Sequence, residues 1–349
     1  MRKIPAILSV SILLLMSLSS AIEQTRELNS DSMQMRSGNN VPDPLHLVDD
    51  SMFAETVNGM DYDDSGNLYY GGSLCGRSST DISTTFECEL TSESGTESTL
   101  SFTPSYVAVM DNEGNRIAAH LFHSGYGDRI DEIIVLENGD ILVAGGFCWL
   151  SNECYFQGDG MLLEAPGRNL DAFVFRMNPS GEVIWSRAFW SAGNDLIHSL
   201  DEGPNGEIYL QGTFCADATG SGCRLNSVEG VEGPLTKGGS DIFIGKLTSD
   251  GSLYWVKTLG SSTEDHTLGG GYWSLQQMGI VASSDGGVLV TGSVCHDGSF
   301  FDTCSFRLSP NDVITSQDGF VAKYSANGSY EWYEKIGGAG VDYVCLLYT

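Results

Sequence analysis

The sequence predicts an all-β protein built from copies of one four-stranded antiparallel unit. Three observations predict it: a glycine-to-cysteine pattern that recurs four times at one spacing, strand-like segments that end in tight-turn signals, and an aspartate at a constant distance after the second turn of each unit. Such self-similarity is typical of repeat architectures, in which each unit buries its apolar faces against its neighbours.

The first hairpin of each unit contains the pattern Gly-x-h-x-h-x-Gly-x-x-Cys, where h is an apolar residue. The first glycine and the cysteine are nine residues apart in all four copies. Gly, Asn and Asp at the turn supply the positive φ angles or side-chain-stabilised bends that short hairpins need. The copies run from Gly66 to Cys75, Gly139 to Cys148, Gly206 to Cys215 and Gly286 to Cys295.

The second hairpin begins with strands predicted at 105–109, 171–175, 241–245 and 318–322. Each strand leads to a turn glycine, at Gly114, Gly181, Gly251 and Gly328. Tryptophan follows four residues after that glycine in three copies, and Ala118 takes its place in the first; the tryptophans are Trp185, Trp255 and Trp332.

An aspartate lies fourteen residues after each of these turn glycines, at Asp128, Asp195, Asp265 and Asp342. One reading is a ring of catalytic or metal-binding carboxylates. The other is structural, because an aspartate in a glycine-rich turn before a strand accepts backbone N–H groups and fixes the turn between units. The constant position favours the structural role.

Many of the predicted strands are continuous apolar runs, which suit strands covered on both faces. Stacking the units in a line would give a solenoid, and stacking them radially would give a β-propeller; four antiparallel strands per unit favour the propeller. The units span about 53–127, 128–194, 195–264 and 265–341, and a fifth begins at 342. We therefore expect an incomplete ring belonging to a longer propeller, with closure through 341–348 as the alternative.

The residues of the third and second units resemble the SBBP type of β-propeller repeat. The resemblance is carried by Asp-Ala-Phe-Val-x-Arg-Met-Asn-Pro-Ser-Gly-Glu-Val-x-Trp at 171–185, Ala-Gly-Asn-Asp at 192–195 and Gly-Glu-Ile-Tyr-Leu-x-Gly at 206–212, and it extends over about 55–349. It implies a propeller fold and export to the cell surface or beyond. It implies no reaction, because that family is defined by its blades.

The N-terminal segment predicts export. Arg2 and Lys3 precede an apolar run over 4–18 and the small residues Ser19, Ser20 and Ala21, so we expect a signal peptide over 1–21, cut after Ala21. Retention as an anchor is the alternative. Residues 22–52 are polar and aperiodic, which predicts a flexible lead-in. No later stretch is apolar over the length of a membrane span, so the mature chain is expected to be secreted or held at the cell surface.

The net charge of −29 opposes binding to nucleic acid or to anionic lipid through long-range repulsion. The sequence has no H-E-x-x-H, G-x-S-x-G, P-loop or dinucleotide-binding motif. We therefore predict no catalytic, cofactor-binding or metal-binding residue.

Nine cysteines behind a signal peptide indicate disulfides. Each pattern cysteine has a second one soon after it, and the intervals are too wide and too varied for a zinc site. We predict one local disulfide per unit, in the pairs Cys75–Cys88, Cys148–Cys154, Cys215–Cys223 and Cys295–Cys304. Cys345 has no assigned partner.

The segments after the second and fourth strands of each unit fall on one face of a propeller, opposite the tight turns. They are long and varied, as binding loops on a rigid scaffold commonly are. The alternative is that their aromatic residues pack onto their own blades. The candidate binding residues are Tyr272, Trp273, Trp149, Tyr155, Phe156, Phe300 and Phe301.

The expected function is therefore binding of a protein partner, a glycan or a component of the cell envelope through this face. A propeller enzyme that hydrolyses or eliminates an extracellular polysaccharide is the first alternative. A purely architectural module of a larger surface protein is the second.

Overall fold

A computed structural model of the chain describes most of the repeat region. The described residues are 56–75, 86–101, 103–125, 127–149, 154–165, 169–216, 223–227, 233, 235–236, 239–261, 265, 279–294, 306–308, 313–314, 318–337 and 344. The chain divides into two units, 1–46 and 47–349, and all described residues lie in the second. The predicted signal peptide and the whole of the polar lead-in therefore lie outside the described residues, and the domain boundaries stay predictions.

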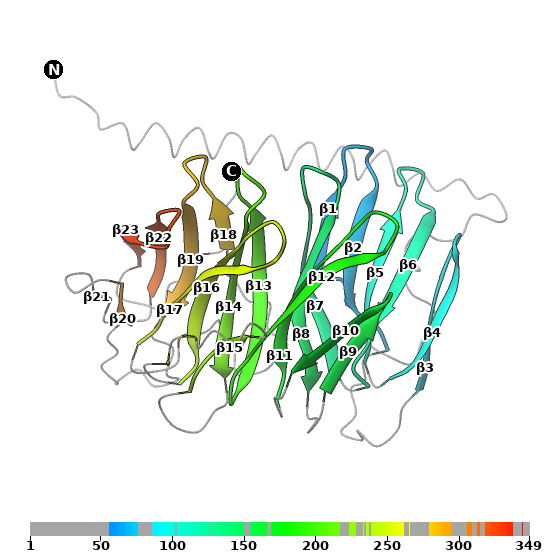
Figure 1. Cartoon of the computed structure of the whole chain (residues 1–349), viewed down its shortest axis with the longest axis horizontal. Coiled ribbons are helices and arrows are strands. Elements are labelled where there is room, and N and C mark those ends of the chain that lie inside the picture. The colour runs from blue at the N-terminus through cyan, green and yellow to red at the C-terminus, as the bar shows by residue number, and fades with distance from the viewer. Residues whose placement is uncertain are drawn as a thin grey trace. The chain divides into compact units, whose positions relative to one another are not determined.

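Four antiparallel sheets, here called blades one to four, follow one another along the described chain (Figure 1). Blade one contains β1 (Gly59–Tyr62), β2 (Leu68–Ser73), β5 (Ser105–Met110) and β6 (Arg116–Phe122). Blade two contains β7 (Gly127–Val135), β8 (Ile141–Trp149), β11 (Asp171–Met177) and β12 (Val183–Trp190), with the short β15 (Asn226–Ser227) added beside β12. Blade three contains β13 (Asn194–Glu202), β14 (Ile208–Ala216), β16 (Asp241–Leu247) and β17 (Leu253–Leu259). Blade four contains β18 (Gly279–Ala282), β19 (Val288–Val294), β22 (Asp318–Tyr324) and β23 (Tyr330–Ile336).

Each blade packs on the next through the first strand of the later one. Strand β7 lies against blade one, β13 against blade two, and β18 against blade three. Blades one and four stand at opposite ends of the row in Figure 1, and within the described residues their strands do not pack together. The predicted all-β propeller-type fold with an open ring is thereby confirmed.

The turn glycines have the backbone conformation that their positions in the repeat require. All eight adopt left-handed φ angles, between 76° and 92°, which residues with a Cβ rarely adopt. They lie in the turns between first and second strands and between third and fourth strands, on the upper side of the blades in Figure 1. The eight are Gly66, Gly114, Gly139, Gly181, Gly206, Gly251, Gly286 and Gly328.

The second glycine of the repeated pattern recurs for a different reason: the backbone of the neighbouring first strand passes too close to it to leave room for a side chain. The first strand of blade three is irregular between Asn194 and Leu196, where its pairing with β14 shifts register. A Cβ added at Gly212 would collide with the carbonyl oxygen of Leu196, and one added at Gly145 in blade two would collide with that of Arg129. Only glycine leaves room for the bulged strand at these positions.

We predict that Gly212→Ala lowers the free energy of unfolding by about 3 kcal/mol, the upper end for an overpacked site. The added methyl group must displace backbone and not a flexible side-chain end. Denaturant titration of the variant and of wild type checks the prediction. Equal midpoints would contradict the close-approach explanation.

The core consists of layers between blades, because inner strands such as β11 and β16 have apolar side chains on both faces. In β11, Phe173 faces a cluster shared with blade one, and its neighbour Val174 faces a cluster shared with blade three. In β16, Phe243 faces blade two and Ile242 faces blade four. All four side chains are fully buried, and burying each such side chain stabilises the fold by about 1.5–3 kcal/mol.

The segments between second and third strands carry small added elements that the sequence did not predict. Hairpins β3 (Phe86–Ser92)–β4 (Gly95–Ser101), β9 (Cys154–Gly158)–β10 (Met161–Ala165) and β20 (Phe306–Arg307)–β21 (Val313–Ile314) belong to blades one, two and four. In blade three the same segment supplies β15, which pairs with β12 of blade two. The inserted hairpin of blade two likewise pairs with the preceding blade, through His123 and Gln157. In the part of the chain that is described, no helix has the length and apolar character that crossing a bilayer demands.

Candidate functional site

A pocket of about 520 Å³ lies where the inserted hairpins of blades one and two meet. It is lined by residues 97–99 of β4, by Leu121 and His123 at the end of the β6 segment, and by residues 157–161 around the β9–β10 turn. Its volume is in the range of sites for small ligands. The two inserts therefore supply most of the pocket lining, and Leu121 is the contribution of a repeated strand, β6.

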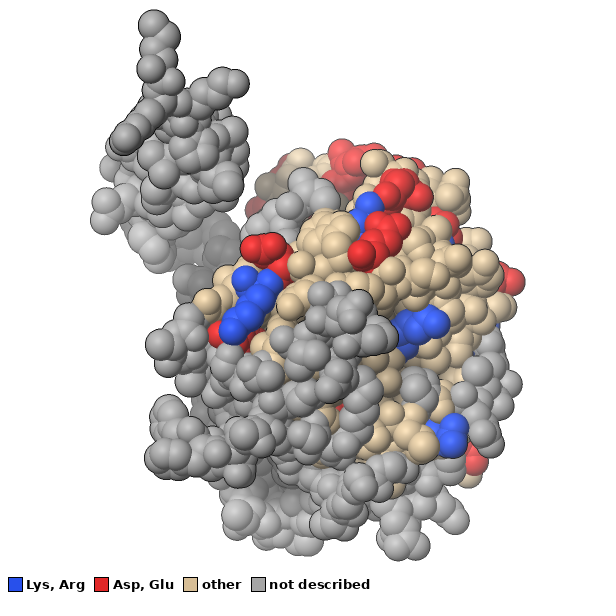
Figure 2. All heavy atoms as spheres, turned by 90° about the vertical axis from the view of Figure 1, so that its left-hand side faces the viewer, with Lys and Arg blue, Asp and Glu red and all other residues tan. Residues whose placement is uncertain are grey.

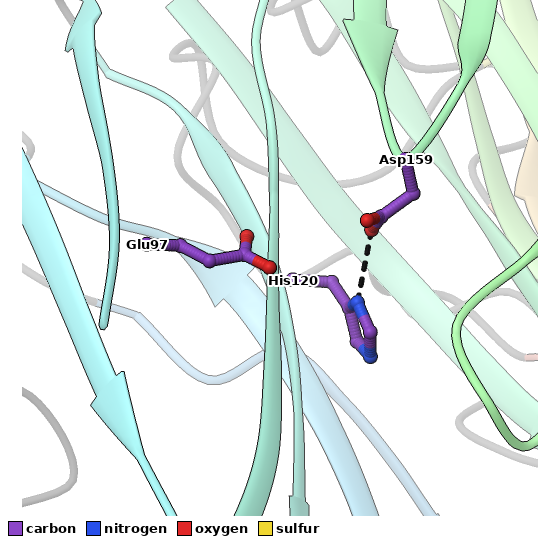
Figure 3. Close-up of side chains that lie close together, drawn as sticks. All are labelled: Glu97, His120 and Asp159. Carbon is purple, nitrogen blue, oxygen red and sulfur yellow. Dashed lines mark ion pairs between the residues drawn. The ribbon is translucent and has the colours of Figure 1, made fainter. Parts of the chain in front are cut away.

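Three side chains with metal-ligating or acid–base chemistry converge beside this pocket (Figure 3). Glu97 comes from β4, His120 from β6 and Asp159 from the β9–β10 turn. Asp159 and Gly160 form that turn with φ angles of 47° and 77°, as expected for an Asp-Gly hairpin turn. The turn aims the Asp159 carboxylate at His120, whose Nδ1 lies 2.9 Å from Asp159 Oδ2.

The three groups perturb one another. Burial lowers the pKa of His120, but the neighbouring carboxylates of Asp159 and Glu97 outweigh burial and leave the pKa raised. Burial raises the pKa of Glu97, against the hydrogen bond that its Oε2 accepts from the Leu121 N–H at 2.7 Å. His120 is also held by blade two, because a Cβ at Gly181 would collide with its ring.

The arrangement suits a divalent cation. One imidazole nitrogen and two carboxylate oxygens lie within 4.8 Å of one another, and zinc sites that leave a coordination position open often use three such ligands. Nothing in the sequence spacing identifies the trio, since residues 97, 120 and 159 come from three irregularly spaced segments. The one usable signal is Asp159-Gly160 between short strand-like runs, which predicts the hairpin but not its neighbours.

We predict that Zn²⁺ raises the melting temperature of the wild-type chain, because a ligand that binds only the folded state stabilises it. His120→Ala should abolish the shift, since it removes the only nitrogen of the trio. His123→Ala is the matched control, because His123 lines the same pocket outside the trio, and it should keep the shift. A shift of equal size in the His120 variant would contradict this assignment.

Two of the predicted binding aromatics have side chains that the structure describes, and they differ in burial. Phe156 is fully buried and packs between Phe147 and Phe173, with ring centroids 5.3 and 4.6 Å away. It belongs to the core, whereas its neighbour Tyr155 is 45% exposed. Tyr272, Trp273, Phe300, Phe301 and the side chain of Trp149 lie outside the described residues.

The repeated aspartates lie buried between blades. Asp128 accepts hydrogen bonds from the Ser124 hydroxyl and N–H and from the Cys148 N–H, at 2.5, 2.7 and 3.1 Å. Asp195 accepts the equivalent bonds from the Ser191 hydroxyl and the Cys215 N–H, at 2.7 and 2.9 Å. Asp265 accepts bonds from the hydroxyl and N–H of Ser261, and Asp342 lies outside the described residues.

This repeated Asp–Ser–Cys arrangement joins the end of one blade to the second strand of the next. Cys148 and Cys215 have left-handed φ angles of 74° and 62°, and their N–H groups donate to the aspartates. Serine stands four residues before three of the four aspartates, at Ser124, Ser191 and Ser261, and glycine stands there before Asp342. This recurrence was a usable signal in the sequence, although the hydrogen bonds that explain it appear only in the folded arrangement.

Burial raises the pKa of Asp128 to about 7 and that of Asp195 to about 8, against the lowering effect of these hydrogen bonds. Asp195 Oδ2 is buried with no hydrogen-bond partner in the described part of the chain, which agrees with a disfavoured charge. A carboxyl whose pKa is raised by folding keeps its proton in the folded state after the unfolded chain has lost it. Folding stability then falls as pH rises from the unfolded pKa to the folded one.

We therefore predict that these two groups make the free energy of unfolding fall between about pH 4 and the folded pKa values of about 7 and 8. Asp195→Asn removes one titrating group and should flatten the dependence in this window. Denaturant titrations across the pH range measure it. An unchanged slope in the variant would show that Asp195 is ionised in the folded protein throughout.

Two of the predicted disulfides are present in the described residues, Cys75–Cys88 and Cys215–Cys223. Cys148 is also disulfide-bonded. The side chain of Cys154 and the residues Cys295, Cys304 and Cys345 lie outside the described residues. Each described bridge ties an insert to the end of a second strand, and closing a short loop of this kind contributes about 2–3 kcal/mol.

No protein-family model matches the chain. An uncharacterized WD repeat-containing protein of Acanthamoeba polyphaga mimivirus is 21% identical over 262 residues, which cover 67% of this chain and 18% of that protein. The regulatory protein FlaEY of Caulobacter vibrioides is 29% identical over 160 residues, 41% of this chain and 16% of that protein. The chain thus spans less than a fifth of the length of these relatives.

Among solved structures, a protein of unknown function from Bacteroides caccae aligns with 80% of this chain and 81% of its own, at 10% identity and a TM-score of 0.25. A score this low carries no argument about the fold. WD repeats form propeller blades, so the similarity to a WD repeat-containing protein agrees with the four blades seen here. It points to a propeller-type repeat protein, and the SBBP type stays a prediction.

Proposed function

We propose that this chain is an exported binding module that recognises a partner, a glycan or a component of the cell envelope through the side bearing its inserts. The observation that carries the proposal is the pocket between β4, β6 and the β9–β10 turn. A pocket built by inserts on repeated blades is the usual way in which a rigid scaffold acquires a binding site.

The distribution of roles within the repeat supports binding. The recurring glycines set turns, the recurring aspartates accept hydrogen bonds between blades, and the strands fill the core. The residues that differ from blade to blade, and could therefore recognise a specific ligand, lie in the inserts. The similarity to a WD repeat-containing protein supports the same class of function.

Export is supported by the N-terminal charge and hydropathy pattern and by the cysteines. The disulfides Cys75–Cys88 and Cys215–Cys223 suit an oxidising compartment. The net charge of −29 would keep such a protein dispersed and repel nucleic acid. These properties together support secretion or display at the cell surface.

One observation favours the enzymatic alternative. Ligand oxygens of Glu97 and Asp159 lie within 4.8 Å of each other, close to the separation of about 5 Å between the carboxyl groups of retaining glycosidases. The raised pKa of Glu97 would suit a general acid. Turnover of an extracellular polysaccharide, abolished by Glu97→Gln, would establish this alternative in place of binding.

We predict that the mature chain from Ile22 onward binds ligands in a glycan array or in an envelope-component binding assay. Tyr155→Ala and the double variant Tyr272→Ala/Trp273→Ala test the two candidate positions. Loss of the aromatic anchor of a ligand should weaken binding about tenfold or more.

Tyr62→Ala is the matched control, because Tyr62 is 62% exposed and ends β1 on the tight-turn side. It should bind as wild type does. Unchanged binding by both test variants, with folding verified by circular dichroism, would contradict the placement of the site. Absence of binding to every glycan and envelope component would contradict the proposed function.

A further inference from the structure

The pocket between the inserts of blades one and two is lined on one side by two carboxylates of the trio Glu97, His120 and Asp159. Glu97 and Asp159 are part of the lining, whereas His120 is not, and only 11% of its side chain is exposed. A cation held by all three groups would therefore stand at the pocket wall. Its remaining coordination positions would face the pocket, where a ligand can reach them.

The ring of His120 contributes a buried nitrogen to this arrangement (Figure 3). Among the described residues its Nδ1 has no hydrogen bond of good geometry, although Asp159 Oδ2 lies 2.9 Å away. Buried polar atoms in folded proteins nearly always have a partner. A metal ion bound to this nitrogen and to the neighbouring carboxylates would supply one, since zinc takes both kinds of ligand at about 2.0–2.2 Å.

The two carboxylates are held in place by the fold. Glu97 Oε2 accepts a hydrogen bond from the N–H of Leu121 on β6, at 2.7 Å. The hairpin that carries Asp159 is fixed to the β6 segment by two backbone hydrogen bonds between His123 and Gln157, of 2.9 and 3.0 Å. Binding to groups that are already in place loses little free energy in ordering them, so such a site can bind a metal ion tightly.

The charge of the pocket decides which ligands need the cation. No Lys or Arg is among the described residues that line it, so its formal negative charge comes from Glu97 and Asp159. The chain carries a net charge of −29, and Asp and Glu side chains gather mainly along the upper edge of the end of the molecule that Figure 2 faces. Without a cation, an anionic ligand is repelled by the pocket and by the whole chain. A divalent cation offsets the two carboxylates and gives an anion a point of attachment.

The rest of the pocket lining suits a sugar. Ser98, Thr99 and Gln157 contribute hydroxyl and amide groups, and Leu121 and Met161 contribute apolar surface. Pockets of this kind orient a ligand through a few polar groups and cover the remainder with apolar contacts. A sugar ring presents both hydroxyl groups and C–H faces, so it can use both parts of the lining.

We propose that a divalent metal ion held by Glu97, His120 and Asp159 anchors the ligand of this pocket, and that the ligand is an acidic sugar whose carboxylate binds the ion. This inference rests on the proposed function, because it names the ligand chemistry of the same pocket. A carboxylate binds a zinc ion more strongly than a neutral hydroxyl does, since it brings a negative charge to the cation. The sugar therefore requires the metal, whereas the metal does not require the sugar.

Isothermal titration calorimetry of the mature chain from Ile22 onward tests both steps, first with Zn²⁺ alone and then with glucuronate. The wild type should bind Zn²⁺, and glucuronate should bind only to the zinc-loaded chain. Glucose has a hydroxymethyl group where glucuronate has its carboxylate. It should bind the zinc-loaded chain about tenfold or more weakly than glucuronate does.

Asp159→Asn should weaken Zn²⁺ binding by more than about a hundredfold, because loss of even an outer-shell partner costs about 10–100-fold. Asparagine tolerates the left-handed φ of 47° at this position, so the turn should persist. Glu164→Gln is the matched control, since it removes a carboxylate of the same hairpin that does not line the pocket, and it should bind both probes as wild type does. Gln157→Ala should keep the zinc affinity and weaken glucuronate binding about three- to tenfold.

Equal zinc affinity in Asp159→Asn and wild type would overturn the metal site. Equal binding of glucuronate with and without zinc would overturn the anchoring role of the ion. Zinc-dependent binding of an acidic peptide in place of glucuronate would overturn the sugar as the ligand. Metal-independent recognition of a glycan or an envelope component in the array would leave the proposed function in place and overturn this inference alone.

Discussion

Blades two and three have apolar side chains on both of their faces, so neither buries its core without a layer on each side. Phe173 and Val174, adjacent in β11, are both fully buried only because blade one covers the first and blade three covers the second. The other repeated features serve this one requirement. The buried aspartates connect the end of one blade to the next. Trp185 and Trp255, from fourth strands, donate to turn carbonyls of the following blades.

The fold was predictable because its determinants are local and repeat. A left-handed turn admits glycine far more readily than other residues, so Gly139 and Gly206 mark hairpins by themselves. The bulge beside Leu196 leaves space only for glycine at position 212, which explains why a second glycine recurs at constant spacing. Constant spacing over four copies then establishes the unit and its strand count.

The candidate site could not be predicted in the same way, because it is built where the repeat is irregular. Glu97, His120 and Asp159 meet only after two inserts have folded against the edge of β6. Their approach depends on hydrogen bonds such as that from the Leu121 N–H to Glu97, which leave no trace in spacing. Phe156 shows the opposite error of sequence-based prediction. As an aromatic residue in an irregular segment it was expected to be available for binding, yet it is buried in the core beside Phe173.

Blade one meets the same requirement within the chain. The β3–β4 hairpin covers the face of blade one that is turned away from blade two, with Cys88 and Leu90 buried beside Tyr106 and Ala108. Hydrogen exchange measured residue by residue at rising denaturant concentration tests this account most directly. Blades two and three should exchange as one cooperative unit, because neither keeps its buried layers without the other; separate opening of the two blades would contradict the account.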